Sequence, residues 1–243
     1  MIHNQSDPVD CACVIHGDLY PWIYVEHLHR MIQRNTSRPV RFHVFTEPER
    51  PVSGDMIRHD LVTWPNIQGN RSGWWYKIQM FDPRHQLKTR LLYFDLDVLI
   101  TSNLDWIWQL DHTKFWAIRD FKYLWNPDWN GLNSSVMLWN TERFWEIWQD
   151  FRQRDRDILI RQYRGDQDYL NDVIDRKDLE FLNPEWIKSW RWQCKDGGLD
   201  WPTRTYKRPG TGTSLESNTK IIVFHGRPKP HEIHDNVVHS TWQ

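Results

Sequence analysis

The sequence has few cysteines and no long hydrophobic run. Only Cys11, Cys13 and Cys194 occur among its 243 residues, an odd and sparse set that argues against a disulfide framework and fits a reducing cytoplasm. The mean hydropathy is -0.76, and no apolar stretch reaches the about 20 residues that a membrane helix needs. The first ten residues lack a basic region followed by an apolar stretch, so no signal peptide is expected. We therefore expect a cytoplasmic protein without a membrane span.

The sequence also lacks an excess of charge of either sign. Lys and Arg number 31 and Asp and Glu 32, giving a formal net charge of -1. No broad basic surface is implied, which argues against non-specific binding of nucleic acid. A content of 39% hydrophobic and 26% charged residues is typical of a folded globular chain.

Tryptophan is unusually abundant, with 17 residues beside 8 Tyr and 10 Phe. A buried indole needs a partner for its N–H group, and so many tryptophans must include several core residues. The flat ring faces also suit the C–H faces of sugars and the bases of nucleotides. We expect some of these side chains to face such a ligand, and the sequence does not indicate which.

The chain opens with the pattern of a β-α-β unit. Residues 9–15 form an apolar run typical of a buried strand, residues 22–32 have apolar positions at helical spacing, and residues 40–44 alternate as in a strand. Cys11 and Cys13 lie within the first run, where small core residues are a better interpretation than a metal pair. Such a unit predicts a parallel sheet with helices on its faces.

The rest of the chain continues this pattern without repeats, low-complexity tracts or a linker. Further strands are expected at 91–94, 136–139 and 221–224, and helices at 75–87 (interrupted near 82–83), 144–151 and 166–174, whereas 48–73 and 176–220 have the composition of loops and irregular segments. The prediction is a single α/β domain over 1–243, with a mostly parallel central sheet flanked by helices.

The strongest chemical motif follows the apolar strand at 91–94. It is Asp95-Leu96-Asp97, a pair of carboxylates at the carboxyl end of a strand, where open α/β sheets bind ligands. Oxygen ligands suit Mg²⁺ or Mn²⁺, and such a cation could neutralise a diphosphate. For this motif alone, an acidic pair facing water is the simpler interpretation.

A second group of polar residues follows the last predicted strand. His225 comes directly after it and could supply an imidazole ligand. Lys229 lies four residues later between Pro228 and Pro230, which stiffen the loop, and its ammonium group could reach phosphates. The joint placement of these residues favours a site over two solvated loop residues.

Six segments in this order resemble the GT-A-fold glycosyltransferases, and most of all glycosyltransferase family 8, which contains glycogenin and the lipopolysaccharide galactosyltransferases. They span most of the chain. The family's first strand with its nucleoside-binding turn corresponds to residues 14–20, a segment with a basic residue near the donor to 76–78, and the metal motif to 93–99. Its Asn-Ser-Gly-Val segment corresponds to residues 133–138, its Asp-Gln motif to 165–171 and its closing His–Gly–Lys–Pro loop to 225–230.

The resemblance implies a transferase that moves a sugar from a nucleotide-sugar, expected to be a UDP-sugar, with retention of configuration and with Mn²⁺ or Mg²⁺ as cofactor. It assigns the metal to Asp95, Asp97 and His225. It assigns the donor to His16, Asp18, Tyr20, Lys77, Asn133, Ser134, Gly226 and Lys229. It assigns catalytic positioning to Asp166, Gln167 and Asp168.

Several of these assignments have plain structural alternatives. Asp18 and Tyr20 would contact the nucleoside, with the Tyr20 ring able to stack on the base, but an ordinary turn after a strand would also contain them. Lys77 would pair with phosphate or with a metal-site carboxylate, unless it is a solvated helix lysine. Asp166 and Gln167 could instead cap the following helix, since Asp is a favoured N-cap residue.

The sequence departs from the family pattern in three places. Ser135 stands where the family usually has Gly. The closing loop is short between His225 and Lys229, and His231 replaces the usual Trp. Residues 176–220 match no family segment, and acceptor contacts are expected there. A glycan, a lipopolysaccharide, a protein and modified DNA therefore all stay open as acceptors.

Three other classes of protein share parts of this pattern. A haloacid-dehalogenase-type phosphatase also places Asp-x-Asp after a strand, but Leu99 and Leu170 stand where its motifs need other residues. A nucleotidyltransferase would have a glycine-rich phosphate loop, and His16-Gly17-Asp18 is poor in glycine. A Trp-rich carbohydrate-binding protein without catalysis would not need Asp95, Asp97 and His225 together.

Overall fold

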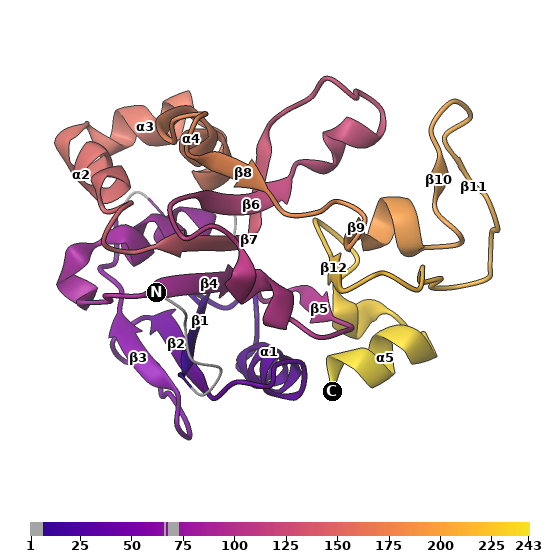
Figure 1. Cartoon of the computed structure of the whole chain (residues 1–243), viewed down its shortest axis with the longest axis horizontal. Coiled ribbons are helices and arrows are strands. Elements are labelled where there is room, and N and C mark those ends of the chain that lie inside the picture. Colours follow the sequence, from indigo (N-terminus) through magenta and orange to yellow (C-terminus); the bar gives the residue numbers. More distant parts are fainter. Residues whose placement is uncertain (1–6, 66, 68–72) are drawn as a thin grey trace.

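The computed structural model describes residues 7–65, 67 and 73–243. Its central layer is a seven-stranded sheet with the order β3-β2-β1-β4-β7-β6-β8 (Figure 1). These strands are β1 (Val9–Val14), β2 (Val40–Thr46), β3 (Ile57–Asp60), β4 (Arg90–Phe94), β6 (Phe115–Arg119), β7 (Leu132–Asn140) and β8 (Leu179–Phe181).

Most neighbours in this sheet run parallel. β1 pairs in parallel with both β2 and β4, β2 with β3, and β6 with β8, whereas β7 is antiparallel to β4 and to β6. The helix α1 (Ile23–Arg34) connects β1 to β2. The predicted β-α-β unit and the mostly parallel α/β sheet are both confirmed.

The sheet is buried on both faces, and its strands alternate between two hydrophobic cores. In β4, Leu92 and Phe94 belong to the core beneath α1, whereas Leu91 and Tyr93 belong to the opposite core. The first core also contains α5 (Asn236–Trp242), and the second is covered by α2 (Glu146–Gln153) and α4 (Asp166–Val173). Cys11 and Cys13 are fully buried free thiols, as their apolar surroundings predicted.

A second sheet that the sequence did not predict lies beside the first (Figure 1). It joins β5 (Val98–Ile100), β12 (Ile221–Val223) and β9 (Ile187–Ser189), with β12 in the middle. The small hairpin of β10 (Leu199–Asp200) and β11 (Thr205–Tyr206) extends beyond it. The expectation that 176–220 is irregular is wrong, since this segment contains the strands β8 to β11. The sequence did not show them because strands of two or three residues are too short for an alternating pattern.

Several helical segments differ from their predicted form. Residues 75–87 form two 3-10 helices, η1 (Gly73–Phe81) and η2 (Pro83–His85), rather than an α-helix, although the break at Asp82 is as predicted. The segment 48–73 contains β3, and residues 66 and 68–72 lie outside the described residues. The remaining helices are α3 (Arg156–Gln162), η3 (Asp105–Gln109), η4 (Phe121–Leu124), η5 (Trp190–Cys194) and η6 (Pro230–Glu232). Among the described residues, no helix is long and apolar enough to cross a membrane.

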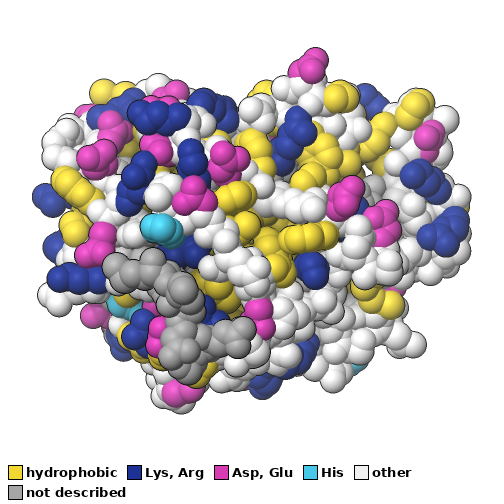
Figure 2. Space-filling view, viewed as in Figure 1, with side chains coloured by type: hydrophobic (Ala, Val, Ile, Leu, Met, Phe, Trp, Pro, Cys, Tyr) yellow, Lys and Arg dark blue, Asp and Glu magenta, His cyan; other side chains and the backbone are white. Residues whose placement is uncertain are grey.

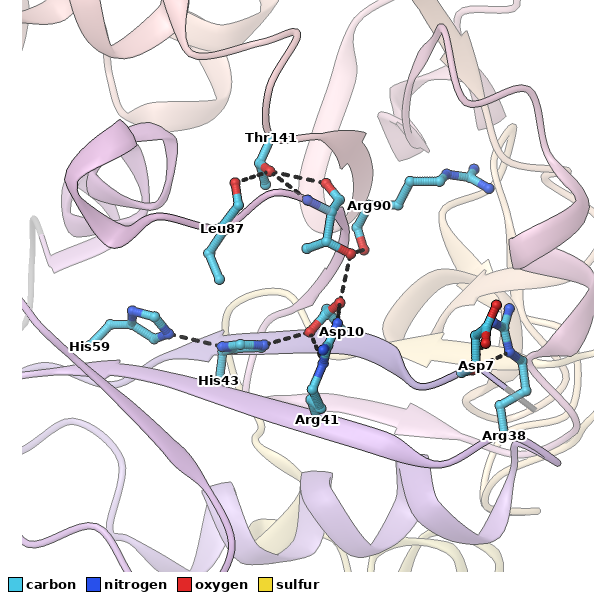
Figure 3. A network of polar contacts seen from close by, with 10 residues as sticks. Asp7, Asp10, Arg38, Arg41, His43, His59, Leu87, Arg90 and Thr141 are labelled. Atoms are coloured by element: carbon cyan, nitrogen blue, oxygen red, sulfur yellow. Dashed lines mark hydrogen bonds and ion pairs between the residues drawn. The ribbon is translucent and has the colours of Figure 1, made fainter. Parts of the chain in front are cut away.

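A buried polar network ties β1 to its neighbours near the start of the strand (Figure 3). The Asp10 carboxylate is 2% exposed. It accepts hydrogen bonds from Arg41 Nε at 2.7 Å and Thr89 Oγ1 at 2.6 Å, and lies 2.8 Å from His43 Nε2. His43 continues the network to His59 on β3 at 2.9 Å. The charge inside the sheet is therefore fully partnered.

Candidate active site

A cavity of about 570 Å³ opens where the main sheet, the second sheet and the start of α4 meet. Its walls come from the turn after β1, from η1, from the segment after β4, from β7, and from the loop that follows β12. Of the residues predicted for the site, all but Asp18 line this cavity: His16, Tyr20, Lys77, Asp95, Asp97, Asn133, Ser134, Asp166, Gln167, Asp168, His225, Gly226 and Lys229. Segments far apart in the chain thus converge on one cavity.

Asp18 is the exception. Gly17 has a φ of 66°, a left-handed conformation that glycine adopts without steric cost, and its N–H donates to the Glu47 carboxylate. The chain then turns so that Asp18 is exposed while Tyr20 reaches the cavity. The structure does not bring Asp18 into the site wall, and its contact with a nucleoside stays a prediction.

The first carboxylate of the acidic pair, Asp95, is held by Lys77 and by Tyr93, whose hydroxyl donates to it at 2.5 Å. Lys77 Nζ lies 2.8 Å from Asp95 and 3.4 Å from Asp166, and it donates to Ser134 Oγ at 3.2 Å. Burial disfavours the charged ammonium, but the two carboxylates raise the pKa of Lys77 above its usual value. Lys77 is therefore a buried cation of the site and not the solvated helix lysine that was the alternative.

The second carboxylate is held by residues from both ends of the chain. Tyr20 donates its hydroxyl to Asp97 at 2.9 Å, and Lys229 Nζ forms an ion pair with the same oxygen. Lys229 also lies over the Tyr20 ring, 5.2 Å from its centroid. The hydroxyl of Tyr20 is thus committed to the acidic pair, whereas stacking of its ring on a base stays a prediction.

His225 occupies the wall beside these carboxylates as a neutral imidazole. Burial, together with the nearby Arg191 and Lys229 cations, lowers the pKa of His225 to about 4. Its Nε2 atom lies 2.6 Å from Ser189 Oγ, and its Nδ1 atom has no protein partner within the described residues. A neutral imidazole with one nitrogen oriented by a hydroxyl and the other free is the form that binds metals.

The chemistry of these donors fits a divalent cation, although they are not yet gathered around one point. Asp95 and Asp97 would supply carboxylate oxygens and His225 an imidazole nitrogen, which suit Mn²⁺ or Mg²⁺. In the part of the chain that the structure describes, no three His, Cys, Asp or Glu side chains are already placed as a ligand set. Because Lys229 holds Asp97, a cation would have to compete with this lysine.

The Asp-Gln segment points into the cavity and does not cap its helix. Gly165 is the N-cap residue of α4 and the cap has no side-chain hydrogen bond. Asp166 is instead buried against Lys77, and Asp168 pairs with Arg164 at 2.7 Å. Gln167 donates its amide nitrogen to Asp120 at 3.2 Å, and its amide oxygen has no protein partner in the part of the chain that the structure describes. The capping interpretation of Asp166 and Gln167 is therefore wrong.

Two residues that depart from the family pattern, Ser135 and His231, fit the structure around them. Ser135 lies in β7 without a left-handed backbone, and its carbonyl accepts the Asp95 N–H at 2.8 Å. Gly226 has a φ of 76°, which a residue with a Cβ rarely adopts. His231 forms a hydrogen bond through Nδ1 with the Tyr24 hydroxyl, which anchors the closing loop to α1.

Sequence reasoning missed several cavity residues, among them Asp120, Lys122, Trp74 and Arg164. Asp120 follows β6 directly, so it is a further carboxylate at a strand end, but that strand was not predicted. Lys122 lies 3.8 Å from Asp120. Trp74 and Arg164 also line the cavity, and a Cβ atom on Gly165 would lie 2.5 Å from the Trp74 indole nitrogen. Only Asp120 carried a usable signal, the apolar run before it.

Solved structures share this fold, although no protein-family model and no curated protein matches the sequence. The galactosyltransferase LgtC, solved in complex with donor and acceptor sugar analogs, gives a TM-score of 0.61 at 16% identity, covering 96% of this chain and 96% of that chain. The glycosyltransferase GlyE of Streptococcus pneumoniae gives 0.63 at 16% identity, covering 96% of this chain and 60% of GlyE. The bifunctional glycosyltransferase WbbM gives 0.60 at 14% identity, with 95% of this chain and 47% of WbbM covered.

One of these comparisons extends over nearly the whole of both chains. LgtC matches almost end to end, whereas GlyE and WbbM contain additional sequence beyond the shared fold. At such low identities the likeness concerns the path of the chain and not the identity of a substrate. The chain has the α/β fold of the GT-A glycosyltransferases, as its motifs indicated.

Proposed function

We propose that the protein is a metal-dependent glycosyltransferase that moves a sugar from a nucleotide-sugar, expected to be a UDP-sugar, to an acceptor. The observation that carries this proposal is the convergence of Asp95, Asp97 and His225 in one cavity with two lysines, Lys77 and Lys229. A volume of about 570 Å³ is within the range of small-molecule and cofactor sites.

The charges of the cavity support a diphosphate leaving group. Asp95, Asp97 and His225 would hold Mn²⁺ or Mg²⁺, which when bound would supply positive charge to the diphosphate oxygens. Lys229 lies next to this set and would add a second positive charge at the departing phosphates. Lys77 would hold the Asp95 carboxylate in a fixed direction.

The Asp-Gln segment supports a sugar. Within the described residues the Gln167 amide oxygen has no protein partner, and it would stabilise positive charge that develops on the sugar ring as the leaving group departs. Asp166 is bound by Lys77 and Asp168 by Arg164, so neither is a free nucleophile. These contacts favour positioning over covalent catalysis and are consistent with retention by attack on the face from which the diphosphate leaves.

A panel of nucleotide-sugars tests this proposal. We expect one donor, from a set of UDP-, GDP- and ADP-sugars, to be hydrolysed slowly in the presence of Mn²⁺ and not in chelator-treated buffer. Asp97→Asn should remove this hydrolysis. If no donor is turned over and no nucleoside diphosphate binds, the cavity belongs to a carbohydrate-binding protein without catalysis. Release of phosphate from simple phosphomonoesters would indicate a phosphatase.

A further inference from the structure

Three tryptophans outside the cavity lining form an exposed aromatic cluster. Trp125 ends η4, Trp192 lies in η5, and Trp201 follows β10. The Trp125 ring centroid lies 4.2 Å from that of Trp201 and 4.9 Å from that of Trp192. Trp125 is 42% exposed, and the other two are half-buried. Two segments distant in sequence therefore present their indole rings at one place on the surface.

This cluster is continuous with the candidate active site. The ring centroid of Trp192 lies 4.1 Å from that of His225, and the ring centroid of Phe121 lies 5.5 Å from the same imidazole centroid. Lys122, three residues before Trp125, lines the cavity itself. The tryptophans thus lie directly beside the part of the cavity wall that His225 forms.

The cluster offers hydrogen-bond donors as well as ring faces. Within the described residues, none of the indole N–H groups of Trp125, Trp192 and Trp201 has a protein partner, whereas Trp190 donates to Thr213 and Trp116 to a backbone carbonyl. The negative face of an aromatic ring attracts the weakly positive C–H groups on one face of a pyranose. Free N–H donors beside that face suit the hydroxyl groups around its edge.

We propose that Trp125, Trp192 and Trp201 form a binding platform for a sugar ring of a glycan acceptor. The proposal rests on the proposed function, since it names the second substrate of the same site. The ring of the glycan would lie on the indoles and direct a terminal hydroxyl past His225 into the cavity. The platform lies largely in the segment 190–201, where no family motif could indicate an acceptor.

The charge around the tryptophan cluster favours a glycan over a nucleic acid as its ligand. Residues 120–129 and 190–206 together carry four basic side chains (Lys122, Arg191, Lys195 and Arg204) and four acidic ones (Asp120, Asp128, Asp196 and Asp200). A groove for single-stranded nucleic acid combines stacking rings with a continuous positive charge. On the face in Figure 2, basic and acidic side chains are interspersed, and no basic stripe is visible. A neutral polyhydroxyl ligand matches this balance.

Ligand-observed saturation-transfer NMR tests the platform without knowledge of the donor. The probes are lactose, maltose, cellobiose and N,N′-diacetylchitobiose, with a single-stranded DNA 12-mer as competitor. We expect at least one disaccharide to bind saturably, and Trp125→Ala and Trp201→Ala to weaken it about ten-fold, the effect of losing a stacking face. Trp125→Phe should retain most of the binding. The matched control is Trp145→Ala, since Trp145 is 38% exposed at the start of α2.

The outcomes are distinct. Failure of all four disaccharides to bind, an equal loss in Trp145→Ala, or displacement of the sugar by the DNA 12-mer would overturn the platform. Circular dichroism and thermal melting confirm that each variant is folded. Binding of UDP with Mn²⁺ should be unchanged in Trp125→Ala. If the wild-type protein binds no nucleoside diphosphate but its disaccharide binding depends on Trp125, the proposed transferase function fails and the platform stands.

Discussion

The ammonium group of Lys229 has two possible partners in the cavity, the Asp97 carboxylate that it contacts here and the phosphates of a donor. We expect Lys229→Ala to weaken binding of a nucleoside diphosphate more than binding of the nucleoside. A charge-assisted contact contributes roughly 1.5–3 kcal/mol. Isothermal titration with both ligands measures the difference. Lys88→Ala, an exposed lysine outside the cavity, should change neither, and equal losses of both ligands in Lys229→Ala would refute the phosphate contact.

Asp97 tests the metal site at the same scale. Asp97→Asn should abolish most Mn²⁺-dependent donor turnover, because an amide is a weaker ligand than a carboxylate, and His225→Ala should do likewise. Both side chains line the cavity, so the variants should melt within a few degrees of the wild type. Asp55→Asn, at an exposed position outside the cavity, is the control. Full turnover by Asp97→Asn in chelator-treated buffer would exclude this metal site.

At the scale of elements, the Asp10 network predicts how the start of β1 responds to acid. Burial alone would raise the pKa of Asp10, but hydrogen bonds with His43, Arg41 and Thr89 outweigh it and lower the pKa to about 2. An unfolded Asp titrates near about 3.9. The stabilisation is therefore complete above about pH 4 and is lost as the pH falls toward about 2.

Urea unfolding over this pH range measures the effect. Asp10→Asn should lower the free energy of unfolding near neutral pH by about 3–5 kcal/mol, since it leaves buried partners without their anion. The stability of the variant should also depend less on pH between about 4 and 2 than that of the wild type. Asp128→Asn, in an exposed loop position, should behave like the wild type. An unchanged pH profile in Asp10→Asn would show that the network does not stabilise the strand.

At the scale of the whole molecule, the arrangement of the side chains around the cavity predicts the stereochemistry of transfer. An inverting enzyme needs a general base on the acceptor side, opposite the leaving group. Asp166 and Asp168 are both engaged by basic side chains, and the Trp192 ring contacts that of His225, so the proposed acceptor platform lies near the proposed metal ligands. We expect the anomeric configuration to be retained. Proton NMR of fresh product, once the donor is known, decides this, and an inverted product would exclude the front-face route.

The acidic pair, His225 and Lys229 could be predicted because each follows an apolar run long enough to be identified as a strand. β4 and β12 lie in different sheets, so only the structure showed how these residues meet: β5, which begins directly after Asp97, pairs antiparallel with β12 and places Val98 opposite Val223. The Asp-Gln segment was located by its resemblance to the family motif, and only the structure showed that Asp166 binds Lys77 rather than capping α4.

Sequence alone determined the β-α-β start and the α/β class, since period-two and helical spacing survive in runs of several residues. Only the tertiary structure decided the second sheet, because strands such as β5 and β9 have three residues each and depend on their partners for hydrogen bonds. It alone placed Asp18 outside the cavity and gathered Trp125, Trp192 and Trp201. A tryptophan has the same chemistry in a core as on a platform, and the difference between them is which surfaces the folded chain leaves uncovered.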